Sequence, residues 1–341
     1  MRKIVFVTSL ICIIVLWHNA LLCAPKSSIS ITGEVRQPLT LTMEDLSRFE
    51  SVSVRLNEVT SDKNYHGAFY YRGVPLKTLL ELADIRKGKK DFFKPIDLVI
   101  LVRSRNGEQV VLSWGEVFYR NPADIIIADS AAPVMPEKSC KNCHQPEVYK
   151  RWYGPLERKI LFPKLVVAND FYTDRSLENI SGIEVLDLHP GMAAIKQSRL
   201  FSPGFTITGM VKRRLYFEDL SSYPHKEIPV KQVGDGIGYH GMRDFEGPSL
   251  EALVNRAGIE PDLNTVFLVS APDGYRSLLS YGELFLNLAG KNIILADKVS
   301  GKPIKEKGKF ILIVPDDLAA DRWVKAVQKI EAIQLKKKTK L

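Results

Sequence analysis

The sequence predicts an α+β protein built from two similar mixed α/β domains in tandem. Three observations lead to this prediction: a globular composition, an internal repeat, and short apolar runs that alternate with helical periodicity. The chain has 341 residues, of which 45% are hydrophobic and 26% charged. This length suits two domains of ordinary size, and this composition is typical of a protein with an apolar core. Mostly disordered, collagen-like and polytopic membrane proteins are excluded.

Ordered matches between the two halves indicate an internal duplication. At a shift of 174 residues, Tyr65-His66-Gly67 matches Tyr239-His240-Gly241, and Gly73, Leu76, Leu79, Ala83 and Ile85 match Gly247, Leu250, Leu253, Ala257 and Ile259. At shifts of 167 and then 147, Ser113, Gly115 and Glu116 match Ser280, Gly282 and Glu283, and Asp174-Arg175 matches Asp321-Arg322. The shift is 168 where Ala128-Asp129 matches Ala296-Asp297 and 147 where Asp170 matches Asp317, which places 21 additional residues in the first repeat, inside the window 130–164.

The repeats set the expected organisation of the chain. We expect a signal peptide or N-terminal anchor at 1–24, a first domain at 29–189 with its insertion at 130–164, a linker at 190–203, a second domain at 204–335, and a basic tail at 336–341. Each domain then has an ordinary size, and the linker contains glycine and proline, which interrupt regular structure.

The first segment has the pattern of a secretory signal. Arg2 and Lys3 precede the apolar run Ile4–Trp17, and Ala20-Leu21-Leu22-Cys23-Ala24 follows it. Cleaved export, retention as an anchor or lipoprotein, and burial as a helix are the alternatives. We expect an extracytoplasmic, periplasm-type location, either soluble or N-terminally anchored.

The elements of the first repeat follow from periodicity. Apolar positions 76, 79, 80 and 83 predict a helix from Val74 to Ile85, and Thr42 with Asp45 predicts a short capped helix. Asn106-Gly107 and Asp273-Gly274 predict equivalent hairpin turns. Short apolar or alternating runs predict strands at Val35–Leu41, Leu98–Arg103, Val110–Leu112 and Leu165–Ala168.

Several segments of both halves resemble the sulfite-oxidase-type molybdopterin-binding domain. The resemblance rests on Leu-Thr-x-x-Asp-Leu (41–46), Gly-Val-Pro-Leu-x-x-Leu-Leu-x-x-Ala (73–83) and Gly-x-x-x-x-Leu-Ser-x-x-Glu (107–116). It implies a mixed α/β fold and raises molybdopterin as a cofactor. In that family a cysteine thiolate binds molybdenum just upstream of the second segment. The corresponding stretches, 59–67 and 233–241, contain no cysteine, so molybdopterin catalysis is the less favoured hypothesis.

Histidines and arginines suggest pockets in both halves. His66 and His240 occupy the place of the missing thiolate and either line a pocket or hydrogen-bond a carbonyl in a turn. Arginine suits anionic ligands, although exposed arginines more often form a solvated face. The residues that could form such an anion-binding patch are Arg72, Arg103, Arg105, Arg243 and Arg276.

The sequence Cys140-Lys141-Asn142-Cys143-His144 has the pattern of c-type haem attachment. Two thiols three positions apart reach both vinyl groups of one porphyrin, and His144 becomes the proximal iron ligand. A disulfide, a thiol redox pair, and a zinc site completed by His66, His189, His225 or His240 are the alternatives. The candidates for a sixth iron ligand are Met135, His189 and Met192.

These features predict an exported redox protein that transfers electrons through one covalent haem c. A non-catalytic binding or scaffold module, with its cysteines in a disulfide or zinc site, is the alternative, and a molybdopterin-dependent oxidoreductase is the second. Enzymatic activity is therefore left open. We expect a redox protein or a small anionic ligand as partner, and possible membrane association through the N-terminus or the basic tail. No nucleic-acid motif is present, so no nucleic-acid partner is expected.

Overall fold

The computed structural model describes residues 27–88, 92–120, 125–135, 147, 151, 153–188, 200–234, 238–305 and 308–336. Strands predominate over short helices, which confirms the α+β class. The elements of the first half are β1 (Ser28–Gly33), β2 (Leu39–Thr42), α1 (Met43–Leu46), β3 (Val52–Val59), β4 (Tyr65–Pro75), α2 (Leu76–Leu82), η1 (Pro95–Asp97), β5 (Leu98–Ser104), β6 (Gln109–Ser113), α3 (Trp114–Phe118), β7 (Ile125–Pro133), η3 (Gly154–Glu157), β8 (Lys164–Val167) and β9 (Ile180–Asp187).

The second half repeats much of this order. Its elements are β10 (Phe205–Gly209), β11 (Leu215–Phe217), β12 (Lys226–Gly234), β13 (Gly238–Gly247), α6 (Leu250–Ala257), β14 (Thr265–Ser270), β15 (Arg276–Ser280), α7 (Tyr281–Phe285), η4 (Leu288–Asn292), β16 (Ile294–Ala296), β17 (Lys298–Val299), β18 (Lys302–Pro303), β19 (Ile311–Ile313), η5 (Ala320–Arg322) and β20 (Lys329–Gln334).

Each half contains a five-stranded sheet with the same strand order. The orders are β2-β1-β9-β5-β6 and β11-β10-β20-β14-β15. In each sheet one pair is parallel, β1 with β9 and β10 with β20, and the remaining pairs are antiparallel. The two halves therefore share one topology. The duplication as the origin of that topology, and the domain boundaries, stay predictions.

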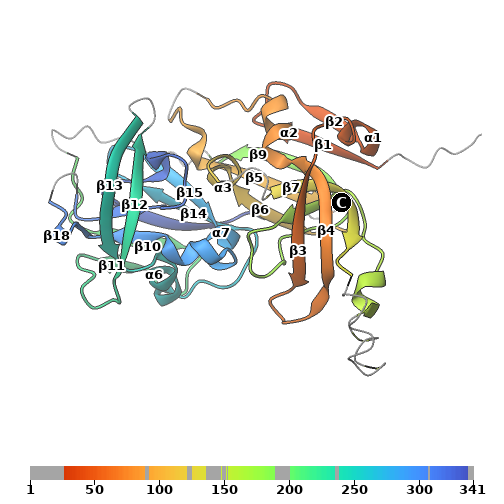
Figure 1. Cartoon of the computed structure of the whole chain (residues 1–341). Coiled ribbons are helices and arrows are strands. Elements are labelled where there is room, and N and C mark those ends of the chain that lie inside the picture. The colour runs from red at the N-terminus through yellow and green to blue at the C-terminus, as the bar shows by residue number, and fades with distance from the viewer. Residues whose placement is uncertain are drawn as a thin grey trace, which may run out of the picture.

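A long hairpin extends from each half. In the first half β3 and β4 belong to a four-stranded sheet of order β3-β4-β7-β8. In the second half β12 and β13 belong to a four-stranded sheet of order β12-β13-β17-β18, whose last two strands are short. The two hairpins project to opposite sides of the molecule, with the halves side by side (Figure 1).

Local sequence explains the predicted turns and caps. Thr42 accepts a hydrogen bond from the Asp45 backbone N–H, and the Asp45 carboxylate accepts one from the Thr42 N–H, which is the expected capping box. Gly107 and Gly274, with φ of 88° and 85°, form the turns of the β5–β6 and β14–β15 hairpins. Both predictions are confirmed.

Several predicted boundaries are wrong. The strand expected from Val35 begins at Leu39, because the Arg36 and Gln37 N–H groups donate to Asp84 and Ala83 beyond α2. The helix expected to reach Ile85 ends at Leu82, because Asp84 has a φ of 53° in the left-handed region, which a helix cannot continue through. The strand expected to end at Ala168 ends one residue earlier.

The halves are joined by an apolar cluster between their central sheets. Val99, Leu101 and Val111 of the first half pack with Val266, Leu268 and Leu278 of the second. Packing of the two sheets against each other removes the apolar surface of these side chains from water, which favours association of the sheets. Among the residues that the structure describes, no helix is both long and apolar enough to span a membrane.

An arginine from each half reaches into the other half. Arg175 donates to Ser280 Oγ (3.0 Å), to Glu116 Oε2 (2.8 Å) and to both oxygens of Asp170 (2.7 Å). Arg322 lies in the equivalent place, bonded to both oxygens of Asp317 (2.6 Å), with Ser113 Oγ 3.4 Å away. Both arginine side chains are fully buried. Each guanidinium is therefore fixed by carboxylates of its own half and contacts the N-cap serine of a helix in the other half.

Candidate functional site

The Cys-x-x-Cys-His motif lies outside the described residues. Cys140, Cys143 and His144 belong to the segment for which no structure is given, as do two of the three candidates for a sixth ligand, His189 and Met192. Met135 is described: it lies two residues beyond the end of β7, with a side chain 48% exposed. Only the described residues on either side of this segment therefore show how the motif is attached to the first half.

Both ends of the insertion contact the beginning of β4. On the outgoing side, the Val134 N–H donates to the Ala68 carbonyl (2.8 Å). On the returning side, Arg158 Nε donates to the His66 carbonyl (3.0 Å). Gly67 lies between these two contacts, and a Cβ there would be 3.0 Å from the Pro155 carbonyl oxygen. The described residues on both sides of the motif thus contact the same end of β4.

A buried ionic network holds the returning end in place. Glu58 accepts hydrogen bonds from Arg158, Lys164 and the Tyr71 hydroxyl, and Glu178 accepts one from Arg158 (2.6 Å). The Arg158 guanidinium also lies 5.4 Å from the centre of the Phe69 ring. Burial raises the pKa of the Tyr71 phenol, and the Glu58 charge raises it further. Because buried charges are tolerated only when paired, this network fixes the position of Arg158.

Sequence reasoning missed this network, although β3 carries a signal for it. Val52, Val54, Leu56 and Glu58 share one face of the strand, since side chains alternate along it. Glu58 thus continues a row of apolar side chains, and a buried carboxylate in such a row needs a cationic partner.

The predicted pocket residues of the first half contact neighbouring side chains and backbone groups. His66 Nε2 lies 3.1 Å from Thr60 Oγ1, and the exposed Arg72 donates to Ser51 Oγ (2.6 Å). Arg103 pairs with Glu184, and Arg105 donates to the backbone carbonyls of Ser28 and Ile180. These contacts tie strand ends and turns together.

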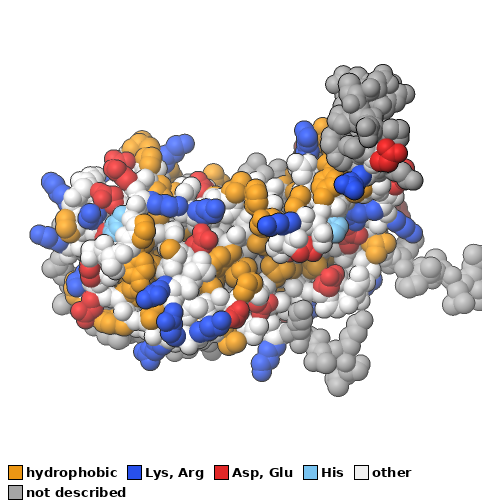
Figure 2. Space-filling view, turned by 90° about the horizontal axis from the view of Figure 1, so that it is seen from below, with side chains coloured by type: hydrophobic (Ala, Val, Ile, Leu, Met, Phe, Trp, Pro, Cys, Tyr) orange, Lys and Arg blue, Asp and Glu red, His pale blue; other side chains and the backbone are white. Residues whose placement is uncertain are grey.

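The second half places its predicted residues differently. Arg276 is buried and donates to Asp97 Oδ2 of the first half (2.7 Å), with its guanidinium 4.9 Å from the centre of the Phe92 ring. Arg243 and His240 instead line cavities beside β13, of about 630 Å³ and 340 Å³. The two cavities share Gln232, Trp323 and Lys325 as lining residues. The five arginines are thus spread over both halves and several sheets. The basic side chains on the face in Figure 2 are likewise dispersed over both lobes.

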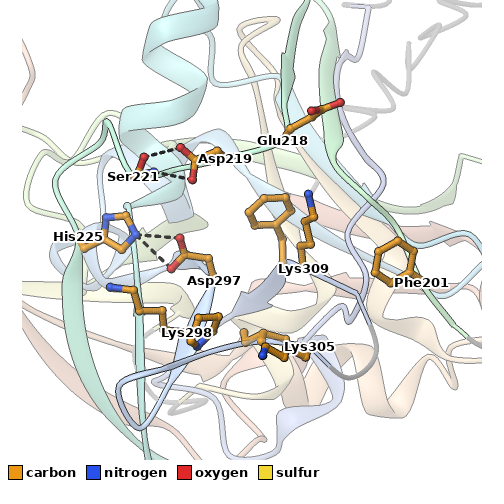
Figure 3. A pocket seen from close by; sticks show the side chains of 12 residues that line it. Phe201, Glu218, Asp219, Ser221, His225, Asp297, Lys298, Lys305 and Lys309 are labelled. Atoms are coloured by element: carbon orange, nitrogen blue, oxygen red, sulfur yellow. Dashed lines mark hydrogen bonds and ion pairs between the residues drawn. The ribbon is translucent and has the colours of Figure 1, made fainter.

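A third cavity, of about 710 Å³, contains a histidine–carboxylate pair (Figure 3). His225 Nδ1 lies 2.8 Å from the Tyr223 carbonyl oxygen, and Nε2 lies 3.0 Å from Asp297 Oδ2. Burial alone lowers the pKa of His225, but the hydrogen bonds to Asp297 and Tyr223 outweigh it, so the pKa is raised. Sequence reasoning named His225 only as an alternative zinc ligand.

The described residues do not fit a molybdenum centre of the expected kind. All four cysteines of the chain lie at 12, 23, 140 and 143, outside the described part, so neither strand around His66 or His240 offers a thiolate. Within the described part, no three His, Cys, Asp or Glu side chains gather as metal ligands. The donor set of the Cys-x-x-Cys-His segment, in contrast, has the chemistry that covalent haem requires.

Comparisons with known proteins assign no family. No protein-family model matches the chain, and no curated protein matches it. Among solved structures it is similar to the sulfane dehydrogenase SoxCD from Paracoccus pantotrophus, with 12% sequence identity and a TM-score of 0.34 over 91% of this chain and 78% of that chain. A TM-score this low assigns neither a fold nor an activity.

Proposed function

We propose that this protein is an exported electron-transfer protein with one covalent c-type haem on the insertion of its first half. The observation that carries the proposal is the segment Cys140-Lys141-Asn142-Cys143-His144. Cys140 and Cys143 hold the porphyrin through thioether bonds, and His144 ligates the iron. The bound haem supplies one-electron transfer, and a Met ligand from Met135 or Met192 gives a higher potential than His189 does.

The attachment of the insertion supports this role. Val134 and Arg158 bind to neighbouring residues of β4, and Arg158 is held by the carboxylates of Glu58 and Glu178. A functional group carried between two fixed points on a sheet keeps a defined position relative to the rest of the molecule. The N-terminal signal pattern agrees with this role, because haem c is attached outside the cytoplasm. A redox protein that docks beside the insertion is the expected partner.

The intact mass of the full chain tests the proposal. From a host that attaches haem c, we expect a mass raised by one haem and a sharp α-band after reduction. Replacement of both cysteines, Cys140→Ala with Cys143→Ala, is expected to abolish the covalent mass increase, because no thiol remains to form a thioether. Lys141→Ala is the matched control, since its position between the cysteines is variable in this motif, and it should keep the haem.

Two other results would contradict the haem assignment. A haem-free mass lowered by two units indicates a disulfide between Cys140 and Cys143. A haem-free chain that retains one zinc ion indicates that the same residues are metal ligands. Either result makes the protein an exported binding module rather than an electron carrier.

A further inference from the structure

We propose that the second half binds one small organic anion with an apolar body, in the cavity lined by Arg243, Lys302 and Lys325. This site is separate from the haem motif and does not depend on it. The inference follows from a comparison of equivalent positions in the two halves.

Strand register establishes the equivalence. Val59 pairs with Tyr65 in the first half, and Val233 pairs with Tyr239 in the second, so Gln232 corresponds to Glu58 and Phe245 to Tyr71. Asn179 and Ala326 have the same unusual φ of 52°, which aligns the residues before them, Glu178 and Lys325. By the same alignment, Ile311 at the start of β19 corresponds to Lys164 at the start of β8.

In the first half these positions are filled by paired charges. Glu58 and Glu178 neutralise Lys164 and Arg158, and Arg158 belongs to the insertion. In the second half the two carboxylates are replaced by the neutral Gln232 and the cationic Lys325. The lysine of β8 is replaced by Ile311, and at the same shift of 147 residues Arg158 corresponds to Lys305. The same place in the fold is therefore lined by two carboxylates in the first half and by neutral and cationic side chains in the second.

The cavity combines cationic and apolar walls. Arg243, Lys302, Lys305 and Lys325 are among its lining residues, and none of the described lining residues is acidic. Phe245 and Trp323 are buried at 4% and 6% exposure and pack edge to face, with Ile304 and Ile311 beside them. The Gln232 Oε1 atom is buried and has no hydrogen-bond partner among the described residues.

These walls define the class of ligand. Lysine and arginine side chains attract a carboxylate or sulfonate group, while an aromatic and aliphatic surface favours an apolar body. A cavity of about 630 Å³ has the size of a small-molecule site. The amide of Gln232 offers a donor and an acceptor to a polar substituent of the ligand. An inorganic oxyanion would leave the apolar walls unused.

Isothermal titration calorimetry of the full chain with naphthalene-2-sulfonate tests the site. We expect saturable binding to one site that weakens with salt, because salt screens the lysines and arginines. Inorganic sulfate, which lacks the apolar body, and 2-naphthalenemethanol, which lacks the charge, should each bind at least about tenfold more weakly.

Gln232→Glu tests the charge of the cavity most directly, because it replaces the amide by a carboxylate of almost the same shape. We expect at least about tenfold weaker binding of naphthalene-2-sulfonate. Gln37→Glu makes the same change at an exposed site of the first half and is the matched control. Lys302→Gln tests the site without risk to folding, since Lys302 is exposed, and it should also weaken binding.

Cys143→Ala should leave sulfonate binding unchanged, which separates this proposal from the haem assignment. Absence of saturable binding, equal binding of sulfate, or wild-type affinity in both Gln232→Glu and Lys302→Gln would overturn the proposal.

Discussion

At the scale of single residues, His225 is held by two hydrogen-bond acceptors. Its ring nitrogens face the Tyr223 carbonyl and the Asp297 carboxylate, so the charged imidazole can donate to both acceptors. Because the folded state raises the pKa of His225 above its usual value of 6.5, the charged pair contributes stability fully below that pH. The contribution is lost as the pH rises through the folded-state pKa.

We therefore predict that stability contributed by His225 declines as the pH is raised above about 6.5. NMR titration of the His225 ring should give a pKa above the usual histidine value of 6.5. In denaturant unfolding, His225→Gln should lose more stability relative to wild type at pH 6 than at pH 9. An equal loss at both pH values would show that the pair contributes nothing through its charge.

At the scale of elements, local chemistry determined what could be predicted. The capping residues of α1 and the glycine turns of two hairpins act within a few residues, so the sequence is sufficient to predict them. The start of β2 could not be predicted this way, because Arg36 and Gln37 bond to the end of α2, almost 50 residues away. Likewise, the network around Glu58 joins residues from three distant segments.

The capping box of α1 gives a test at this scale. Thr42→Ala removes the side-chain oxygen that accepts the Asp45 N–H, and we expect a loss of about 1 kcal/mol in the free energy of unfolding. Ser53→Ala, at an exposed position of β3, is the control and should change stability little. Chemical denaturation measures both. If the two variants lose the same amount, the cap does not stabilise α1.

The candidate sites show the same division between local and distant information. The Cys-x-x-Cys-His motif is contiguous, so the sequence alone identifies its chemistry. The cationic cavity is assembled from β12, β13, β18 and the segment after η5, and only the folded chain brings Gln232 and Lys325 together. Of the predicted arginines, Arg276 donates to Asp97 in the other half, a contact that no local sequence pattern indicates.

At the scale of the whole molecule, the reciprocal arginines make each half depend on the other. Arg175 lies directly over Gly282, and Arg322 lies directly over Gly115. A side chain at either glycine would overlap a guanidinium that is buried and held by carboxylates. The two glycines therefore permit the close approach of the halves. The two halves differ at the glutamates beside these arginines. Arg120 and Arg322 together lower the pKa of Glu283 against the effect of burial. Burial instead raises the pKa of Glu116.

We predict that Gly282→Ala destabilises the whole protein by about 2 kcal/mol or more, because the new methyl group cannot fit beside Arg175. Gly88→Ala is the matched control, since a Cβ there meets nothing within 4 Å. Thermal unfolding should show a single transition at a lower temperature for Gly282→Ala. Two separate transitions, with only one of them shifted, would mean that the halves fold independently.

The shared attachment of the insertion ends to β4 has an engineering consequence. Val134 and Arg158 contact Ala68 and His66, residues that are only two positions apart on one strand. A loop closed at such a point can change in length at a small entropic cost, since closure entropy grows only with the logarithm of loop length. We therefore expect that the chain between these two contacts can be changed in length, or exchanged for another peptide, while the sheets of the first half keep their pairing.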